Sequence, residues 1–265
     1  MEGKTSLVKV LGRIMDEDII ITLDVDWAPD WCIQRVADAL IRDNIKATWF
    51  ITHDSPAIQG LKQNSDLFEL GVHPNFNEGS TQGNDVQEIM DYLTLIVPDA
   101  QSLRTHSLFY SFRIIEYLNF HYDIKYDSSL LLWNTAHINP HKLYLSKNKF
   151  IIRLPIFWED DVEMRTLSPN FSLKPPKYNV PGMKIFNFHP IHICLNSCSL
   201  DKYEACKAMN SSITCLTKEK VAPFIHQGSG TKTLFRELID HLVANGRTGA
   251  TIAEIGDTFC SNCSY

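Results

Sequence analysis

The chain has 265 residues, 44% of them hydrophobic and 21% charged, a composition typical of a globular protein with a full hydrophobic core. Its formal net charge is -6 and it has no long run of lysine and arginine, which excludes the basic surface that nucleic-acid binding needs. No apolar run approaches the ~20 residues of a membrane-spanning helix, and Met1 to Glu17 has no signal-peptide pattern. We therefore expect a cytoplasmic protein with no nucleic-acid partner and no membrane span. The oligomeric state stays open.

The predicted elements alternate between strand and helix along the chain. The apolar run Ile19 to Leu23 is typical of a strand buried on both faces, and Pro29-Asp30 begins a helix. Ala47 to Ile51, rich in β-branched and aromatic residues, predicts a second strand. Further helices are expected within residues 56–68, 86–97, 112–118 and 234–243, and further strands at 70–73, 102–106, near 124, and at 150–156, 184–189 and 250–255.

This alternation predicts parallel strands joined by helical crossovers. Because α/β barrels of roughly 200 to 250 residues commonly form one unit, we expect a single domain over residues 1–265 with its core in residues 18–256. The proline-rich stretch 168–182 is expected to be a surface loop.

Two late segments have weaker signals. Cys260 and Cys263 have the spacing of one zinc knuckle, but a structural zinc site usually shows two such pairs, so reduced thiols are the expected state. Gly228 to Thr231 could cradle an anion at the start of the last predicted helix. A flexible loop and helix cap is the expected role.

Polar side chains capable of chemistry stand where the predicted strands end, and the carboxyl ends of parallel barrel strands face one common mouth. These residues are Asp24, Asp26, His73, Arg104, His106 and His189. Asp24 and Asp26 share one face of an extended segment, and two carboxylates so close repel each other unless a cation or a proton intervenes. Imidazole and carboxylate suit zinc and related divalent metals. We expect these side chains to gather around one bound cation.

The order of the motifs resembles that of the NodB-type polysaccharide deacetylases, carbohydrate esterase family 4. The family's Thr-Phe-Asp-Asp-Gly motif corresponds here to Thr22-Leu23-Asp24-Val25-Asp26-Trp27, and its histidine motif to His73-Pro74-Asn75-Phe76-Asn77. The remaining motifs correspond to Arg104-Thr105-His106-Ser107, Phe157-Trp158-Glu159-Asp160-Asp161 and Ile185-Phe186-Asn187-Phe188-His189. The resemblance covers roughly Ile19 to His189 and the closing elements. It is closest to the WbmS-type proteins encoded with bacterial O-antigen synthesis genes.

The resemblance implies an irregular (β/α)7 barrel and a metal-dependent hydrolase that removes an N-acetyl group from an amino sugar of a bacterial polysaccharide or its precursor. It implies a divalent ion, zinc, held by Asp26, His73 and either Asn77 or His106. Asp24 is the implied general base, Arg104 keeps that carboxylate ionised, and His189 is the implied general acid. The implied substrate-binding residues are Trp27, Trp158, Glu159 and Asp160, although a bare tryptophan such as Trp158 is more often a core residue.

Three departures from the family pattern affect the assignment. Val25 separates the paired aspartates, which could shift the roles of base and ligand. Asn77 stands where a second metal histidine is expected, and His106 replaces the usual proline and could supply the missing ligand.

Two other functions remain open. One is a deformylase of the same superfamily that acts on an N-formyl amino sugar. The other is a non-catalytic carbohydrate-binding protein whose metal site has degraded. The chain has no Gly-x-Ser-x-Gly elbow, and no Gly-x-Gly-x-x-Gly follows the first strand, which disfavours serine hydrolases and Rossmann dehydrogenases.

Overall fold

The computed structural model describes residues 19–174, 176–209 and 212–262. Its strands are β1 (Ile19–Asp24), β2 (Ala47–Ile51), β3 (Phe68–Val72), β4 (Ser102–Leu103), β5 (Tyr126–Asp127), β6 (His141–Tyr144), β7 (Phe150–Arg153), β8 (Trp158–Glu159) and β9 (Lys184–Phe188). They form one sheet in the order β6-β7-β5-β4-β3-β2-β1-β9-β8. Neighbouring strands pair in parallel except β6 and β7, which pair antiparallel, so the expectation of parallel strands is confirmed for most of the sheet.

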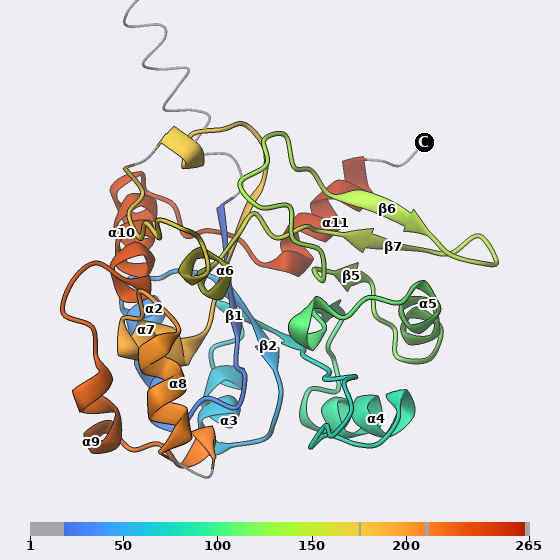
Figure 1. Ribbon diagram of the computed structural model, residues 1–265. Helices are drawn as coiled ribbons and strands as arrows, with labels where there is room; N and C mark the ends of the chain where they lie inside the picture. Colours follow the sequence, from blue (N-terminus) through green and yellow to red (C-terminus); the bar gives the residue numbers. More distant parts are fainter. Residues whose placement is uncertain (1–18, 175, 210–211, 263–265) are drawn as a thin grey trace, which may run out of the picture.

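The helices pack against this sheet. They are α2 (Asp30–Arg42), α3 (Pro56–Lys62), α4 (Val86–Ile96), α5 (Phe112–His121), α6 (Asp160–Met164), α7 (Pro190–Leu195), α8 (Asp201–Ala208), α9 (Lys218–Val221), α10 (Thr231–Ala244) and α11 (Ile252–Asn262), with short 3-10 turns η1 (His106–Leu108), η2 (Pro176–Tyr178), η3 (Ile213–Cys215) and η4 (Ala222–Phe224). Figure 1 shows α2, α7 and α10 together on one side of β1, and α4 and α5 on the other side of the sheet. None of the described helices is long and apolar enough to cross a membrane.

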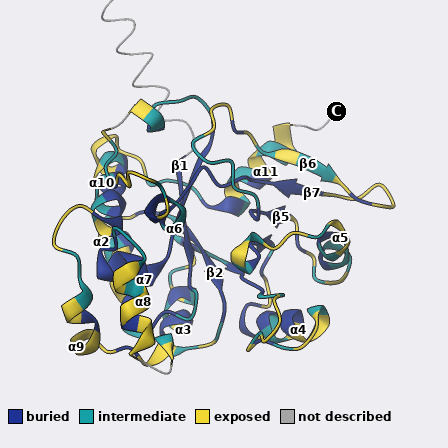
Figure 2. Cartoon of the chain, viewed as in Figure 1, coloured by how far each residue is buried: buried dark blue, intermediate teal, exposed yellow. Residues whose placement is uncertain are grey.

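The central strands form the core. Every residue of β1, β2 and β9 is buried, as expected for parallel strands covered on both faces. Figure 2 shows β1 and β2 in the buried centre of the molecule. The sheet is curled, because the segment that contains β7 and β8 pairs with β5 at its start and with β9 at its end. A mixed α/β fold with a curled sheet is thus confirmed, whereas seven regular strand–helix units are not.

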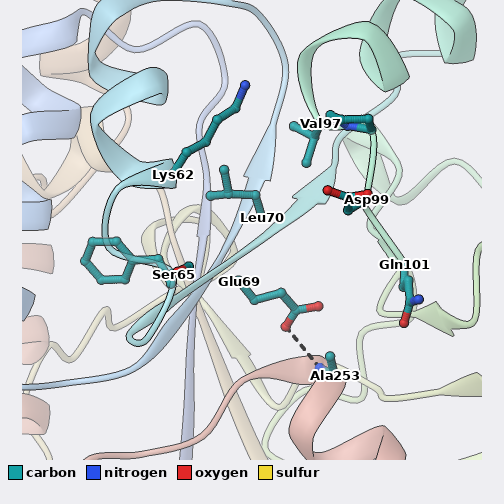
Figure 3. Close-up of a pocket in the computed structure, with 10 residues that line it drawn as sticks. Lys62, Ser65, Glu69, Leu70, Val97, Asp99, Gln101 and Ala253 are labelled. Atoms are coloured by element: carbon teal, nitrogen blue, oxygen red, sulfur yellow. Dashed lines mark hydrogen bonds between the residues drawn. The ribbon is translucent and has the colours of Figure 1, made fainter.

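The predicted last strand, residues 250–255, is wrong. Only Ala250 bridges β1, at Ile20, and α11 begins two residues later. Thr251 and Glu254 form a reciprocal capping box, since the backbone N–H of each donates to the side chain of the other. Glu69 on β3 accepts a further hydrogen bond from the backbone N–H of Ala253 (Figure 3). These contacts end the strand and start a helix.

This contact lies in a cavity around the amino end of β3, whose lining residues are drawn in Figure 3. The cavity has a volume of about 400 Å³. The carboxylate of Glu69 is already engaged there by the hydroxyls of Thr48 and Ser102 as well as by Ala253. Glu69 therefore links β2, β3, β4 and α11. It lies at the end of the strands opposite the polar residues that the sequence analysis named.

The loop before α10 has a capping role. Gly230 N–H donates to the hydroxyl of Thr233, and Thr231 N–H donates to the carbonyl of Ser197. These bonds fit the expected capping role of the loop. Cys260 is half-buried on α11, and Cys263 lies outside the described residues.

Candidate active site

The polar residues at the strand ends come together. Asp24 is the last residue of β1, His73 and Arg104 directly follow β3 and β4, His106 begins η1, and His189 follows β9. Because these strands run in parallel, their carboxyl ends meet at one edge of the sheet. The convergence expected from the sequence is therefore present for all six side chains.

Asp26 is the centre of the first group. Its Oδ1 lies 3.1 Å from Nε2 of His73 and 3.1 Å from Nδ1 of His106. The candidate ligand atoms of these three residues all lie within 4.8 Å of one another. Burial raises the pKa of Asp26, but hydrogen bonds to His106 and His73 outweigh it and hold that pKa well below its ordinary value. The group thus presents an ionised carboxylate and two imidazoles.

The backbone is strained beside two of these residues. Asp26 and Trp27 have φ of 44° and 56°, and Ser107 and Leu108, which follow His106, have φ of 56° and 50°. Residues other than glycine rarely adopt this left-handed backbone conformation, which costs of order 1–3 kcal/mol per residue. The strained backbone lies in the two turns that position the side chains of Asp26 and His106 close to each other.

Arg104 fixes the position of Asp24. It is fully buried, and its Nη1 donates to Oδ1 of Asp24 at 2.9 Å. The guanidinium also donates to Ser128 through Nε and Nη2, and it stacks over the ring of Phe50 at 4.3 Å. The amide of Asn187 donates to the second oxygen of Asp24 at 2.8 Å. Burial raises the pKa of Asp24, but Arg104, with smaller effects from the nearby histidines, leaves it below its ordinary value.

His189 is held by Asp160, the first residue of α6. Nδ1 of His189 lies 2.7 Å from Oδ1 of Asp160, and its backbone N–H donates to Oδ2 at 2.9 Å. Nε2 faces Asp26 Oδ2 at 3.5 Å. Burial lowers the pKa of His189, but Asp160 and Asp26 raise it well above the ordinary value. Asp160 thus fixes the orientation of the His189 ring, with Nε2 facing Asp26.

Some predicted site residues lie elsewhere or have other partners. Asn77 is exposed, and its side-chain amide nitrogen donates to Asn75. Trp158 is fully buried between aromatic rings and donates to Glu163, so the structure does not support a sugar contact for it. Asp160 uses both oxygens on His189, which gives it a positioning role instead of a substrate contact.

Trp27 and Glu159 lie beside the centre. The ring of Trp27 is half-buried and meets the ring of His106 edge to face at 5.4 Å. Glu159 is buried near Asp24 and His189. Burial and the charge of Asp161 raise the pKa of Glu159 well above its ordinary value.

Three functional partners were missed by the sequence analysis. Thr22 and Asn187 accept hydrogen bonds from Arg104 Nη1, and Ser128 accepts from Nη2. The available signal was a polar residue inside an otherwise apolar strand, since Thr22 and Asn187 interrupt β1 and β9. A buried polar side chain in a central strand needs a partner, which here is Arg104.

His192 is a buried histidine on α7, three residues after His189. Its Nδ1 lies 3.1 Å from Oγ of Ser197, and its ring packs against Tyr203 at 4.7 Å. Burial, with a smaller contribution from His189, lowers the pKa of His192 to about 3.

We expect His192 to make the protein sensitive to acid. Below the ordinary pKa of ~6.5 the unfolded chain binds a proton at this position, whereas the folded chain does not until the pH nears 3, so stability is lost as the pH falls through this window. At pH 5 the loss is about 2 kcal/mol. Urea unfolding of His192→Asn at pH 7 and pH 5 should show a pH difference smaller by that amount. The exposed His121→Asn is the control, and an unchanged pH difference in His192→Asn would contradict the assignment.

The fold is that of a polysaccharide deacetylase. The chain is similar to a crystal structure of the Bordetella bronchiseptica protein WbmS, which is described as a polysaccharide deacetylase involved in O-antigen biosynthesis. The similarity has a TM-score of 0.73 and 30% sequence identity, and it covers 84% of this chain and 89% of that one. None of the curated proteins compared with the chain matches it.

A family model described as WbmS-like polysaccharide deacetylase matches residues 21–207, which include every site residue named above. The chain belongs to the WbmS-like polysaccharide deacetylase family.

Proposed function

We propose that this protein is a metal-dependent amide hydrolase that removes an N-acetyl group from an amino sugar of a bacterial polysaccharide precursor, in the synthesis of O-antigen. The observation that carries the proposal is the grouping of Asp26, His73 and His106 beside Asp24 and His189. The family membership and the described role of the Bordetella protein support it. Such a precursor is made in the cytoplasm, where we expect the protein to act.

The residues fit a divalent ion. One carboxylate and two imidazoles suit zinc, and three protein ligands are the usual number in catalytic zinc sites, where the fourth position stays open. Asp26, His73 and His106 would hold the ion. The sequence left the third ligand open between Asn77 and His106, and we propose His106. When bound, such an ion polarises a carbonyl and lowers the pKa of water.

Asp24 is placed to act as the general base. Its low pKa keeps it ionised at neutral pH, and Arg104 and Asn187 hold its two oxygens so that the carboxylate cannot rotate. His73 Nε2 lies 4.0 Å from Oδ2 of Asp24, so the base adjoins the proposed ligands. A water molecule between Asp24 and the ligand group could lose its proton to Asp24 while it attacks the amide carbon.

His189 is placed to act as the general acid. The raised pKa supplies a proton on the imidazole at neutral pH, and Asp160 fixes the ring with Nε2 toward Asp26. That proton can pass to the amine that leaves when the amide bond breaks. Base and acid therefore both adjoin the ligand group, and their pKa values are shifted in opposite directions, as a paired acid and base require.

A cavity near the turn that follows Asp26 is the proposed place for the sugar. This cavity of about 780 Å³ is lined by Ala28 and Trp31 from the turn and helix after β1, by His53 after β2, and by residues 214–219. This volume is in the range of ligand sites. Residues 214–219 lie beyond the family match, so this wall would adapt the site to its own sugar. Trp27 directly precedes Ala28 in the chain, and its ring contacts the ring of His106, so Trp27 is the proposed sugar contact.

The experiment is a panel of N-acetylated and N-formylated amino sugars and their nucleotide-linked forms, with acetate and formate measured separately. Acetate release by the wild type that is lost in Asp26→Ala would support the proposal. Release of formate alone would identify a deformylase. Binding of sugars without release of either acid would point to the non-catalytic reading.

A further inference from the structure

Glu159 has no role in the chemistry described so far. It is the last residue of β8 and is only 8% exposed. Its Oε2 is buried and has no hydrogen-bond partner among the described residues. A buried carboxylate oxygen without a partner destabilises the fold, and a bound ligand would supply that partner.

Glu159 belongs to a second group of candidate ligands. One ligand atom from each of Asp24, Glu159 and His189 lies within 4.8 Å of the other two, and all three residues are buried. Two carboxylates and one imidazole suit zinc and related divalent ions. This group is distinct from the one around Asp26.

The contacts of His189 suit it to a role as a metal ligand as well as to a role as the general acid. Nδ1 is engaged by Asp160 at 2.7 Å, which leaves Nε2 directed toward the interior of the site. A carboxylate on the far nitrogen is the usual support of a metal-bound histidine, because it fixes the tautomer and makes the near nitrogen more basic. Nε2 of His189 is therefore the nitrogen that would face an ion in this group.

Asp26 connects the two groups. Its Oδ1 faces His73 and His106, whereas its Oδ2 lies 3.5 Å from Nε2 of His189. A carboxylate with one oxygen toward each group is placed to bridge two ions, as in two-metal sites, where the ions lie roughly 3.5–4 Å apart.

We propose that Asp24, Glu159 and His189 form a second cation site, and that a divalent ion bound there inhibits the enzyme. The inhibition rests on the proposed function, because the second ion occupies the general base and the general acid together. The second ion binds more weakly than the first, since Arg104 Nη1 already neutralises part of the charge on Asp24 at 2.9 Å. Zinc at low concentration then activates the protein, and zinc at higher concentration stops it.

Equilibrium dialysis of the full chain against rising concentrations of zinc tests the site without a substrate. The wild type should reach about two ions per chain in two separate steps, and Glu159→Gln should stop at about one, having lost the weaker step. The exposed Asp38→Asn on α2 is the matched control, because it makes the same change in charge at a carboxylate outside both groups of candidate ligands. It should keep both steps.

His106→Ala separates this proposal from the first metal site, because it should lose the tighter step and keep the weaker one. A wild type that binds one ion, with Glu159→Gln identical to it, overturns the second site alone and indicates that Glu159 instead shares a proton with Asp161. A wild type that binds no ion overturns both proposals. Should Glu159→Gln fail to fold, manganese bound to the wild type decides, since two ions this close give a spin-coupled electron paramagnetic resonance spectrum and one ion does not.

Discussion

Replacing Asp24 with asparagine is expected to lower kcat/KM by roughly 10²- to 10⁴-fold, the usual contribution of a general base, while the tightly bound ion stays in place. Asparagine keeps an oxygen that can accept from Arg104, but it cannot take a proton from water. Asp24 is not among the three residues proposed to hold the first ion, so metal binding and catalysis should separate. Acetate release and metal content, measured on the same preparation, check both parts.

Asp26→Asn is the matched variant, since it makes the same chemical change two residues further along. It should lose the ion as well as the activity, because Oδ1 of Asp26 is the atom that both His73 and His106 approach. Should Asp24→Asn lose the ion while Asp26→Asn keeps it, the roles of the two aspartates would be exchanged, which is the shift that the intervening Val25 left open.

The parts of the fold that the sequence predicted correctly are those in which local pattern and burial agree. β1 and β2 are continuous apolar runs, and both are buried along their whole length. The site followed from the same pattern, because a polar residue directly after such a run must lie at the end of a strand. Asp24, His73 and His189 were predictable in this way without knowledge of the pairing.

The parts that failed depend on contacts distant in sequence. The apolar residues of 250–255 resemble a strand, but Thr48 and Glu69 supply partners for the first N–H groups of α11 and so favour the helix. The capping box of Thr251 and Glu254 was readable in the sequence and outweighs the apolar pattern. Helix α8 was missed because charged residues occupy several of its faces, so it has little helical periodicity to detect.

The direction in which each side chain points was the hardest property to predict. Trp158 and Glu159 are neighbours in one strand, so their side chains point to opposite faces of the sheet. Only the curl of the sheet decides that Trp158 enters the aromatic core and Glu159 approaches Asp24. Asn77 was placed by analogy with a family motif, and the loop that holds it directs its amide to Asn75 instead.

Arg104→Met is expected to lower the free energy of unfolding by about 3–5 kcal/mol at pH 7, the cost of removing one partner of a buried ion pair. Methionine fills part of the volume, but Asp24 keeps a buried charge whose strongest favourable electrostatic contact is gone. Ser128, Thr22 and Asn187 each lose a hydrogen bond from the guanidinium. The exposed Arg113→Met on α5 is the control, and it should change stability by no more than about 0.5 kcal/mol.

The double variant Arg104→Met with Asp24→Leu tests whether the loss comes from the stranded carboxylate. Replacing both members of a buried pair by apolar residues is often nearly neutral, so urea unfolding should show the double variant to be more stable than Arg104→Met alone. Additive losses from the two substitutions would mean that Arg104 stabilises the fold mainly through its contacts with Ser128 and Phe50. In that case the low pKa of Asp24 would need another origin, and the ionised base on which the proposed reaction depends would lose its support.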